Sequence, residues 1–309
     1  MTEIGIRLLA ETDLGDADRV FRLAFGTQFG LAEPMSFRGD AGMVRPRWSS
    51  DPAGALGAFR DTELIGSAFA ARWGSFGVFG PITVRPDCWG SGVGKRLLEP
   101  AMALFESWGI KHIALFTFPQ STKHVALYQK FGFWPQFLTV VLSKAVEHPP
   151  EAAHWFRYSD SPWSLPECAA LTGSIFPGLD LEREIRAVHD QKLGDTVLLR
   201  DGARLQGLAV CHIGKGSEAG TGATYVKFAA VRPGQDAQGH FERLLVACEA
   251  LALDQRSPRI IAGVNTARHA AYRKLLQRGY QGLLHGVAMQ RPNRAGYNTP
   301  DHFVIDDWR

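Results

Sequence analysis

Long apolar runs are missing from this sequence of 309 residues. No stretch approaches the roughly 20 consecutive apolar residues that a helix needs to cross a bilayer. The first sixteen residues carry acidic side chains where a signal peptide carries cations, and they lack an apolar core of sufficient length. We therefore expect a cytoplasmic protein with no membrane partner.

Cysteine pairs and metal-binding patterns are missing as well. The four cysteines lie far apart, with no Cys-x-x-Cys pair among them (Cys88, Cys168, Cys211 and Cys248). The ten histidines form no His-Glu-x-x-His or similar pair. Since disulfide frameworks and zinc sites depend on such spacings, we expect reduced thiols and no metal cofactor.

The sequence also lacks an excess of charge of either sign. The chain has 34 lysines and arginines against 31 aspartates and glutamates, a formal net charge of +3, without a long basic run. Binding to nucleic acid depends on a concentrated cationic surface, so we expect no nucleic acid partner. No pattern in the sequence indicates an oligomeric state.

What the sequence does contain is material for two globular domains. Apolar residues make up 45% and charged residues 21%, and the length is about twice a common domain size of roughly 150 residues. The first half reads as short strands followed by alternating helices and strands, with strands at 55–60, 64–73, 75–84, 111–118 and 137–146 and helices at 92–109 and 122–132. Because an antiparallel opening precedes strand–helix–strand units, we predict a mixed α/β fold, with a mixed sheet and helices on its faces.

The second half repeats the first at a constant spacing. Residues 84–98 read VRPDCWGSGVGKRLL and residues 231–245 read VRPGQDAQGHFERLL, so seven of fifteen positions are identical at an offset of 147 residues. A stretch with paired prolines, EHPPEAAH at residues 147–154, separates the copies. We therefore predict two tandem domains of one fold, residues 1–147 and 148–309.

The stretch WGSGVGKR at residues 89–96 is rich in glycine, which indicates a backbone that approaches a ligand closely. It fails the Walker pattern, which needs glycine at position 89 and a hydroxyl residue at 96, and its G-x-G-x-G spacing fails the G-x-G-x-x-G dinucleotide pattern. A strand leads into the loop and a helix follows, so backbone N–H groups at the helix end would attract a pyrophosphate. A glycine-rich hairpin loop is the alternative that this stretch alone leaves open.

Together with a second motif, the glycine stretch resembles the GNAT N-acetyltransferase family. In that family a loop [QR]-x-x-G-x-[GA] follows a strand ending V-x-P, and a later helix reads N-x-x-A-x-x-L-Y-x-K-x-G-F. Here VRPDCWGSGVGKRLL and STKHVALYQKFGF occur in the same order, and the resemblance covers residues 1–146. The sequence departs from the family at three positions, where Trp89 replaces Gln or Arg, Ser121 replaces Asn and His124 replaces Ala.

The resemblance implies an acetyl-CoA site in the first copy. The pantetheine arm would pair with the edge of strand residues 82–84, and the pyrophosphate would lie on the glycine loop. Tyr128 matches the tyrosine that gives a proton to the departing thiolate. The alternative is a purely structural role, in which the ring of Tyr128 only packs against its neighbours. The cofactor-binding residues that the resemblance implies are Ile82, Thr83, Val84, Gly90, Ser91, Gly92, Val93, Gly94, Lys95 and Ser121. No residue stands out as the general base.

The second copy is expected to keep the fold and to lose the chemistry. At the offset of 147 residues Tyr128 becomes Leu275, and Val93–Gly94 becomes His240–Phe241. Tyr272 and Asn265 lie near Leu275 in the sequence, which leaves a shifted acid open. A bulky side chain adds no donor to a phosphate nest, so we expect this copy to bind CoA weakly or not at all. The last residues, FVIDDWR at 303–309, either brace the contact between the copies or form a plain final strand.

These observations predict an acetyl-CoA-dependent N-acetyltransferase with its active site in the first copy. The sequence does not identify the acceptor amine. The alternative is a non-enzymatic protein that binds or senses acyl-CoA. Tyr128 beside a complete glycine loop favours the enzyme.

Overall fold

The computed structural model describes residues 4–147 and 154–309, which we name the N-terminal half and the C-terminal half. The N-terminal half contains β1 (Ile4–Leu8), α1 (Leu14–Gln28), α2 (Val44–Ser50), β2 (Ala55–Arg60), β3 (Glu63–Trp73), β4 (Phe76–Val84), α3 (Val93–Ser107), β5 (His112–Thr117), α4 (Thr122–Gln129) and β6 (Trp134–Ala145). The C-terminal half contains β7 (Trp155–Arg157), α5 (Leu165–Gly173), α6 (Glu182–Asp190), β8 (Gly194–Asp201), β9 (Arg204–Gly214), β10 (Gly220–Val231), α7 (Ala237–Asp254), β11 (Arg259–Asn265), α8 (His269–Gln277), β12 (Gln281–Arg291) and β13 (Val304–Ile305). Apart from β13, these strands and α-helices follow the same order in both halves.

The described strands join one 13-stranded sheet in the order β1-β2-β3-β4-β5-β12-β6-β11-β10-β9-β8-β7, with β13 attached to β10. Most neighbours are antiparallel, whereas β4–β5 and β10–β11 are parallel. Successive residues of β3 point to opposite faces of the sheet and pack on different helices. Leu64 joins the core under α1, and Ile65 joins the core under α3. The mixed α/β fold predicted from the sequence is confirmed.

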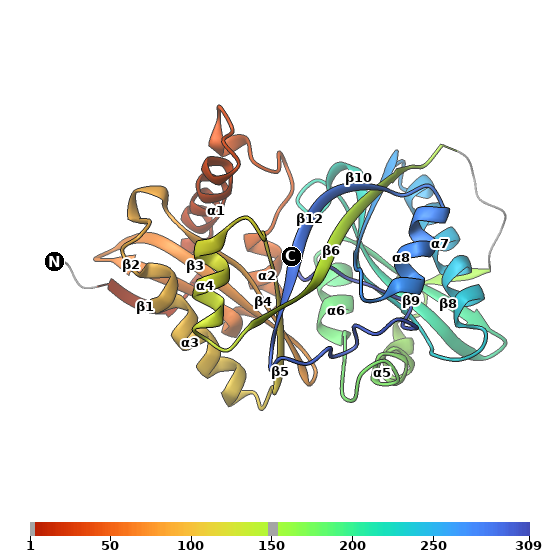
Figure 1. Ribbon diagram of the computed structural model, residues 1–309. Coiled ribbons are helices and arrows are strands. Elements are labelled where there is room, and N and C mark those ends of the chain that lie inside the picture. The colour runs from red at the N-terminus through yellow and green to blue at the C-terminus, as the bar shows by residue number, and fades with distance from the viewer. Residues whose placement is uncertain (1–3, 148–153) are drawn as a thin grey trace.

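The two halves exchange their last strands. In Figure 1 the yellow-green β6 crosses into the C-terminal half, and the blue β12 crosses into the N-terminal half. Along Thr139–Ala145, β6 pairs with β11, while β12 pairs with β5 along Ile113–Thr117. The two exchanged strands also pair with each other. Each half of the sheet is therefore completed by a strand from the other half.

One apolar core crosses the boundary between the halves. It holds Trp73, Phe76 and Val78 of the N-terminal half against Phe228 and Trp308 of the C-terminal half, all of them buried. Burying large side chains from both sides stabilises their association in proportion to the apolar area removed from water. The halves therefore form one continuous body. No helix of the described residues is long and apolar enough to span a membrane.

The strands β4 and β5 pair over a short distance and then separate. Their parallel pairing covers Phe76–Val78 of β4 and His112–Ala114 of β5. Beyond Val78, β4 continues to Val84 with β3 on one side, while β5 continues with β12 on its other side. The facing edges of the two strands are therefore unpaired with each other towards their carboxyl ends.

Candidate active site

The glycine loop lies exposed at the N-terminal end of α3. Gly90 and Gly92 have φ angles of +81° and +85°, which residues with a side chain rarely adopt. A Cβ atom at either position would meet no heavy atom within 4 Å, so the space beside the loop is open. The first hydrogen bond of the helix runs from Arg96 N to Gly92 O at 3.2 Å. The N–H groups of residues 93–95 precede this bond and suit an anionic ligand at the helix end.

The polar side chains of the loop differ in how firmly they are held. Ser91 donates its hydroxyl to Cys88 O at 2.6 Å, which stabilises the turn. The ammonium of Lys95 lies 3.6 Å from the carboxylate of Glu99, and both side chains are exposed. Arg96 donates to Ile4 O of β1 at 3.0 Å. Since an exposed pair of this kind is weak, Lys95 is the cation that can turn towards the loop.

The edge of β4 that faces away from β3 leads directly to this loop. Arg85 N donates to Ile65 O of β3 at 2.9 Å, and backbone groups alternate in direction along a strand. The N–H and C=O groups of Ile82 and Val84 therefore face the divergence, whereas those of Thr83 face β3. The buried hydroxyl of Thr83 also lies 3.0 Å from that of Ser67.

Trp89 makes a polar contact with this edge of β4. Its indole Nε1 donates to Val84 O at 2.7 Å, which ties the start of the loop to the end of β4. The ring is half exposed beside the loop. The departure from the family pattern at this position therefore leaves a side chain that still donates a hydrogen bond. Ile82 N–H, Ile82 C=O and Val84 N–H remain on the divergent edge.

Tyr128 lies in α4 with its ring buried against β4. Its ring centre is 6.5 Å from that of Phe79 and 6.2 Å from that of Phe133, both at steep angles. Burial raises the pKa of Tyr128, so the phenol stays protonated at neutral pH. Within the described residues its hydroxyl has no hydrogen-bond partner, which leaves the O–H group available as a donor.

Ser121 stands immediately before α4, and its side chain contacts a residue in the first turn of that helix. Its hydroxyl lies 2.7 Å from Nδ1 of His124. Burial, and then the charge of Lys123, lower the pKa of His124, so the imidazole is neutral at pH 7. Leu127 of α4 lies beside the loop, because a Cβ atom at Gly94 would be 3.5 Å from Leu127 Cδ2. The structure thus brings together the predicted strand edge, glycine loop and tyrosine helix.

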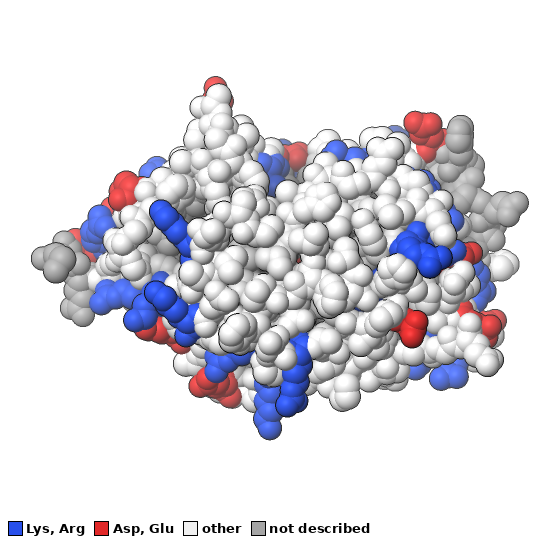
Figure 2. All heavy atoms as spheres, viewed as in Figure 1, with Lys and Arg blue, Asp and Glu red and all other residues white. Residues whose placement is uncertain are grey.

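The face of the molecule that carries α4 has little charge at its centre. Figure 2 shows lysines and arginines mainly along the edges, with few charged residues over α4, β6 and β12. Large apolar side chains are exposed on the two exchanged strands, namely Trp134, Phe137, Leu138 and Leu283. The surface beside α4 is therefore neutral and partly apolar.

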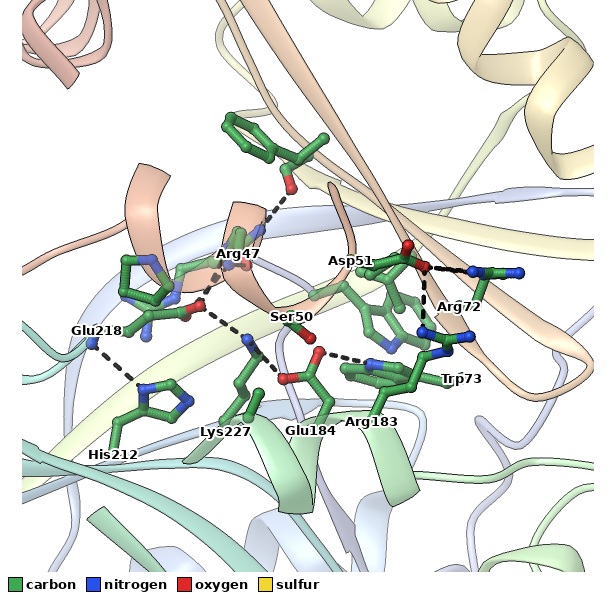
Figure 3. Close-up of a pocket in the computed structure, with 18 of the residues that line it drawn as sticks. Arg47, Ser50, Asp51, Arg72, Trp73, Arg183, Glu184, His212, Glu218 and Lys227 are labelled. Atoms are coloured by element: carbon green, nitrogen blue, oxygen red, sulfur yellow. Dashed lines mark hydrogen bonds and ion pairs between the residues drawn. The ribbon is translucent and has the colours of Figure 1, made fainter. Parts of the chain in front are cut away.

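A buried ionic network joins the halves next to β4, and sequence reasoning missed it. Arg47 of α2 donates to both carboxylate oxygens of Glu218 at 3.0 and 3.2 Å, and to backbone oxygens of Gly80 and Arg309. Figure 3 shows Lys227 between two carboxylates, at 2.7 Å from Glu218 and 3.1 Å from Glu184. The cavity there measures about 40 Å³, room for about one water molecule. The network is therefore a joint that holds β4 at Gly80, two residues before Ile82.

The charge states in this joint follow from its contacts. Burial opposes the charge of Glu218, but Arg47 and Lys227 hold the pKa of that carboxyl well below its usual range. Burial lowers the pKa of His212 to about 4. The Nδ1 atom of His212 accepts from Glu218 N at 3.3 Å, and its buried Nε2 has no partner among the described residues. His212 is therefore neutral at pH 7, next to fully paired charges.

Part of the chain is similar to a known protein family. Residues 24–133 match the sequence model of the acetyltransferase (GNAT) family. No curated protein matches the sequence. Among solved structures, a putative acetyltransferase from Pyrococcus horikoshii is similar over 100% of this chain and 96% of its own, with a TM-score of 0.72 and 15% identity.

Two further structures show the same fold. A GCN5-related N-acetyltransferase from Sphaerobacter thermophilus has a TM-score of 0.57 and 14% identity over 93% of this chain and 95% of its own. A glucosamine N-acetyltransferase region of a fungal GH3 β-N-acetylglucosaminidase has a TM-score of 0.63 and 15% identity, covering 94% of this chain and 38% of that one. At these identities the similarity shows the fold, and it extends over both halves.

Proposed function

We propose that this chain, whose residues 24–133 carry a domain of the GNAT acetyltransferase family, is an acetyl-CoA-dependent N-acetyltransferase with one active site, in the N-terminal half. The observation that carries the proposal is a continuous ligand path. The divergent edge of β4 ends at a loop whose Gly90 and Gly92 leave open space before the donors of α3. A phosphate-bearing, extended ligand such as CoA fits such a path.

The proposed reaction uses the groups along this path. A neutral acceptor amine attacks the thioester carbonyl, and the C–S bond breaks as the C–N bond forms. Ile82 N–H faces the divergence and would stabilise the negative charge on the carbonyl oxygen, a contribution of about 3 kcal/mol for such a donor. Tyr128 gives its proton to the departing thiolate, and the amine releases its surplus proton to solvent. The raised pKa of Tyr128 keeps that proton in place before the reaction.

The proposed arrangement has two domains, residues 1–147 and 148–309, of which only the first binds CoA. The boundary residues 148–153 lie outside the described part of the chain. At the position that corresponds to Tyr128 the C-terminal half has Leu275, whose side chain is buried. The exchange of β6 and β12 makes the second domain necessary for the first, because β5 pairs with β12.

Turnover of acetyl-CoA against a panel of primary amines tests this proposal. Release of free CoA thiol is measured for the wild-type chain and for Gly92→Asp as the matched inactive variant. We expect acceptor-dependent thiol release by the wild type alone. Binding of CoA without turnover of any amine would instead favour the acyl-CoA-sensing alternative, and absence of CoA binding would contradict both.

A further inference from the structure

The last residues of the chain, 303–309, which we call the C-terminal segment, lie in a cleft of the C-terminal half. β13 pairs antiparallel with β10, with Ile305 opposite Ala229 and Val304 opposite Ala230. Val231 N donates to Phe303 O at 3.3 Å. Val304 and Ile305 are fully buried. Figure 1 shows the C-terminus between the two halves.

This cleft is the counterpart of the divergence between β4 and β5. β10 pairs in parallel with β11 over Thr224–Val226 and then leaves it. At the offset of 147 residues, Ala229 and Ala230 correspond to Ile82 and Thr83. The C-terminal segment therefore pairs with the same stretch of strand on which the N-terminal half offers an open edge.

Two replacements around the cleft contact the C-terminal segment directly. Phe241 stands at the position of Gly94, and its ring centre lies 5.2 Å from that of Phe303. Arg268 stands at the position of Ser121 and is fully buried. Its guanidinium donates to Val304 O at 3.0 Å, to Asp306 O at 3.1 Å and to the Asp306 carboxylate at 2.8 Å. Positions that would face a cofactor in the first half therefore hold a peptide in the second.

The polar groups of the segment find their partners inside the cleft. The Asp306 carboxylate also accepts from Tyr297 Oη at 2.7 Å, and Trp308 Nε1 donates to the same Tyr297 oxygen at 2.9 Å. Tyr225 of β10 donates to Asp307 at 2.8 Å. A buried pair such as Arg268 and Asp306 is costly to separate, because either charge alone would remain out of water. The segment is thus seated by several matched contacts.

We propose that the divergent-strand cleft of the C-terminal half is a peptide-binding groove, that its ligand is the chain's own residues 303–309, and that this occupant closes the groove to CoA. The proposal is independent of acetyl transfer in the N-terminal half. It makes the segment a fixed internal ligand, whose end carries Arg309 to the joint with Arg47.

Hydrogen exchange on the intact chain tests whether the groove is permanently occupied. We expect the amide of Ile305, which pairs with Ala229 of β10, to exchange at least about a hundredfold more slowly than in a free peptide of the same sequence. Saturating CoA should leave this protection unchanged, while Arg268→Met should reduce it in the segment. Exchange within seconds in the wild type, or loss of protection on adding CoA, would overturn the proposal.

Peptide binding in trans gives a second test. A chain ending at His302 is mixed with a fluorescent peptide of residues 300–309, and a peptide with Asp306→Ala serves as the control. We expect saturable binding of the first peptide, at least about tenfold tighter than the control, with recovery of the melting temperature of the full chain. Equal binding of both peptides by a folded shortened chain would contradict the groove; if the shortened chain does not fold, the exchange experiment decides. The exchange rates without CoA and the affinity for the peptide do not depend on CoA binding, so a failure of the proposed enzyme function would be distinguishable.

Discussion

Gly92→Asp tests the phosphate loop, because it adds a side chain and a charge where the ligand's pyrophosphate is expected. Gly92 has a φ of +85° and caps α3. The strain of a side chain there is about 1 kcal/mol, of which an aspartate at the helix N-cap recovers a few tenths of a kcal/mol relative to glycine. The melting temperature should therefore change little. That carboxylate would, however, compete with phosphate for the helix donors and repel it.

The expected loss is in CoA affinity. Two unit charges 4 Å apart near a protein surface repel by about 4 kcal/mol, which salt reduces. We expect a loss of about 3 to 4 kcal/mol, or CoA binding about 10²- to 10³-fold weaker by calorimetry. Gly109→Asp is the matched control, since Gly109 also has a positive φ of +71° and open space around it. It lies beyond the other end of α3, roughly 25 Å away.

The control should lose stability, because an aspartate at a helix C-terminus also opposes the helix dipole, but it should keep its CoA affinity. Unchanged CoA affinity in Gly92→Asp would refute the assignment of the loop. Equal losses in the two variants would show that affinity falls through general destabilisation.

Three further predictions concern the tyrosine and the joint between the halves. Tyr128→Phe keeps the ring and removes the donor, so kcat should fall by about 10²-fold at unchanged CoA affinity, and an unaltered kcat would mean that another group protonates the thiolate. Arg47→Met leaves Glu218 with Lys227 as its remaining cation, and urea denaturation should show a free energy of unfolding lower by about 3 to 5 kcal/mol. A loss below about 1 kcal/mol would contradict the role of the joint. Burial lowers the pKa of His212 from 6.5 to about 4. The unfolded chain therefore binds this proton at a higher pH than the folded chain does, and the free energy of unfolding falls as the pH drops from about 6.5 towards 4. Between pH 7 and 5 this loss should be about 2 kcal/mol smaller in His212→Gln, and equal losses in the two proteins would show that other groups cause it.

Local sequence patterns predicted the mixed α/β fold because they depend on nearby residues. The largely apolar run at residues 137–146 indicated a strand, and β6 is indeed a strand from Trp134 to Ala145. Its neighbours could not be predicted, since β6 and β12 are equivalent strands of a repeat and either would fit beside β5. Non-local packing decides the pairing, and it exchanges the two strands.

The candidate site, like the fold, could be predicted from the sequence only in part. Gly90 and Gly92 could be identified from their spacing, because only glycine adopts their backbone conformation without strain. Glu218 lies between β9 and β10 without any motif, and it meets Arg47 across 171 positions of sequence. The bonds of Arg268 to the C-terminal segment likewise arise only when the fold is complete. A departure from a family pattern, as at Arg268, marks such a position without naming its partner.

The most direct measurement is a crystal structure of the whole chain grown with excess acetyl-CoA. The account predicts one ligand per chain, with the pyrophosphate at residues 90–95, the pantetheine arm along Ile82 and Val84, and the thioester sulfur next to the Tyr128 hydroxyl. The cleft between β10 and β11 should still hold residues 303–309. A ligand bound in the C-terminal half, or one bound away from the glycine loop, would contradict the account.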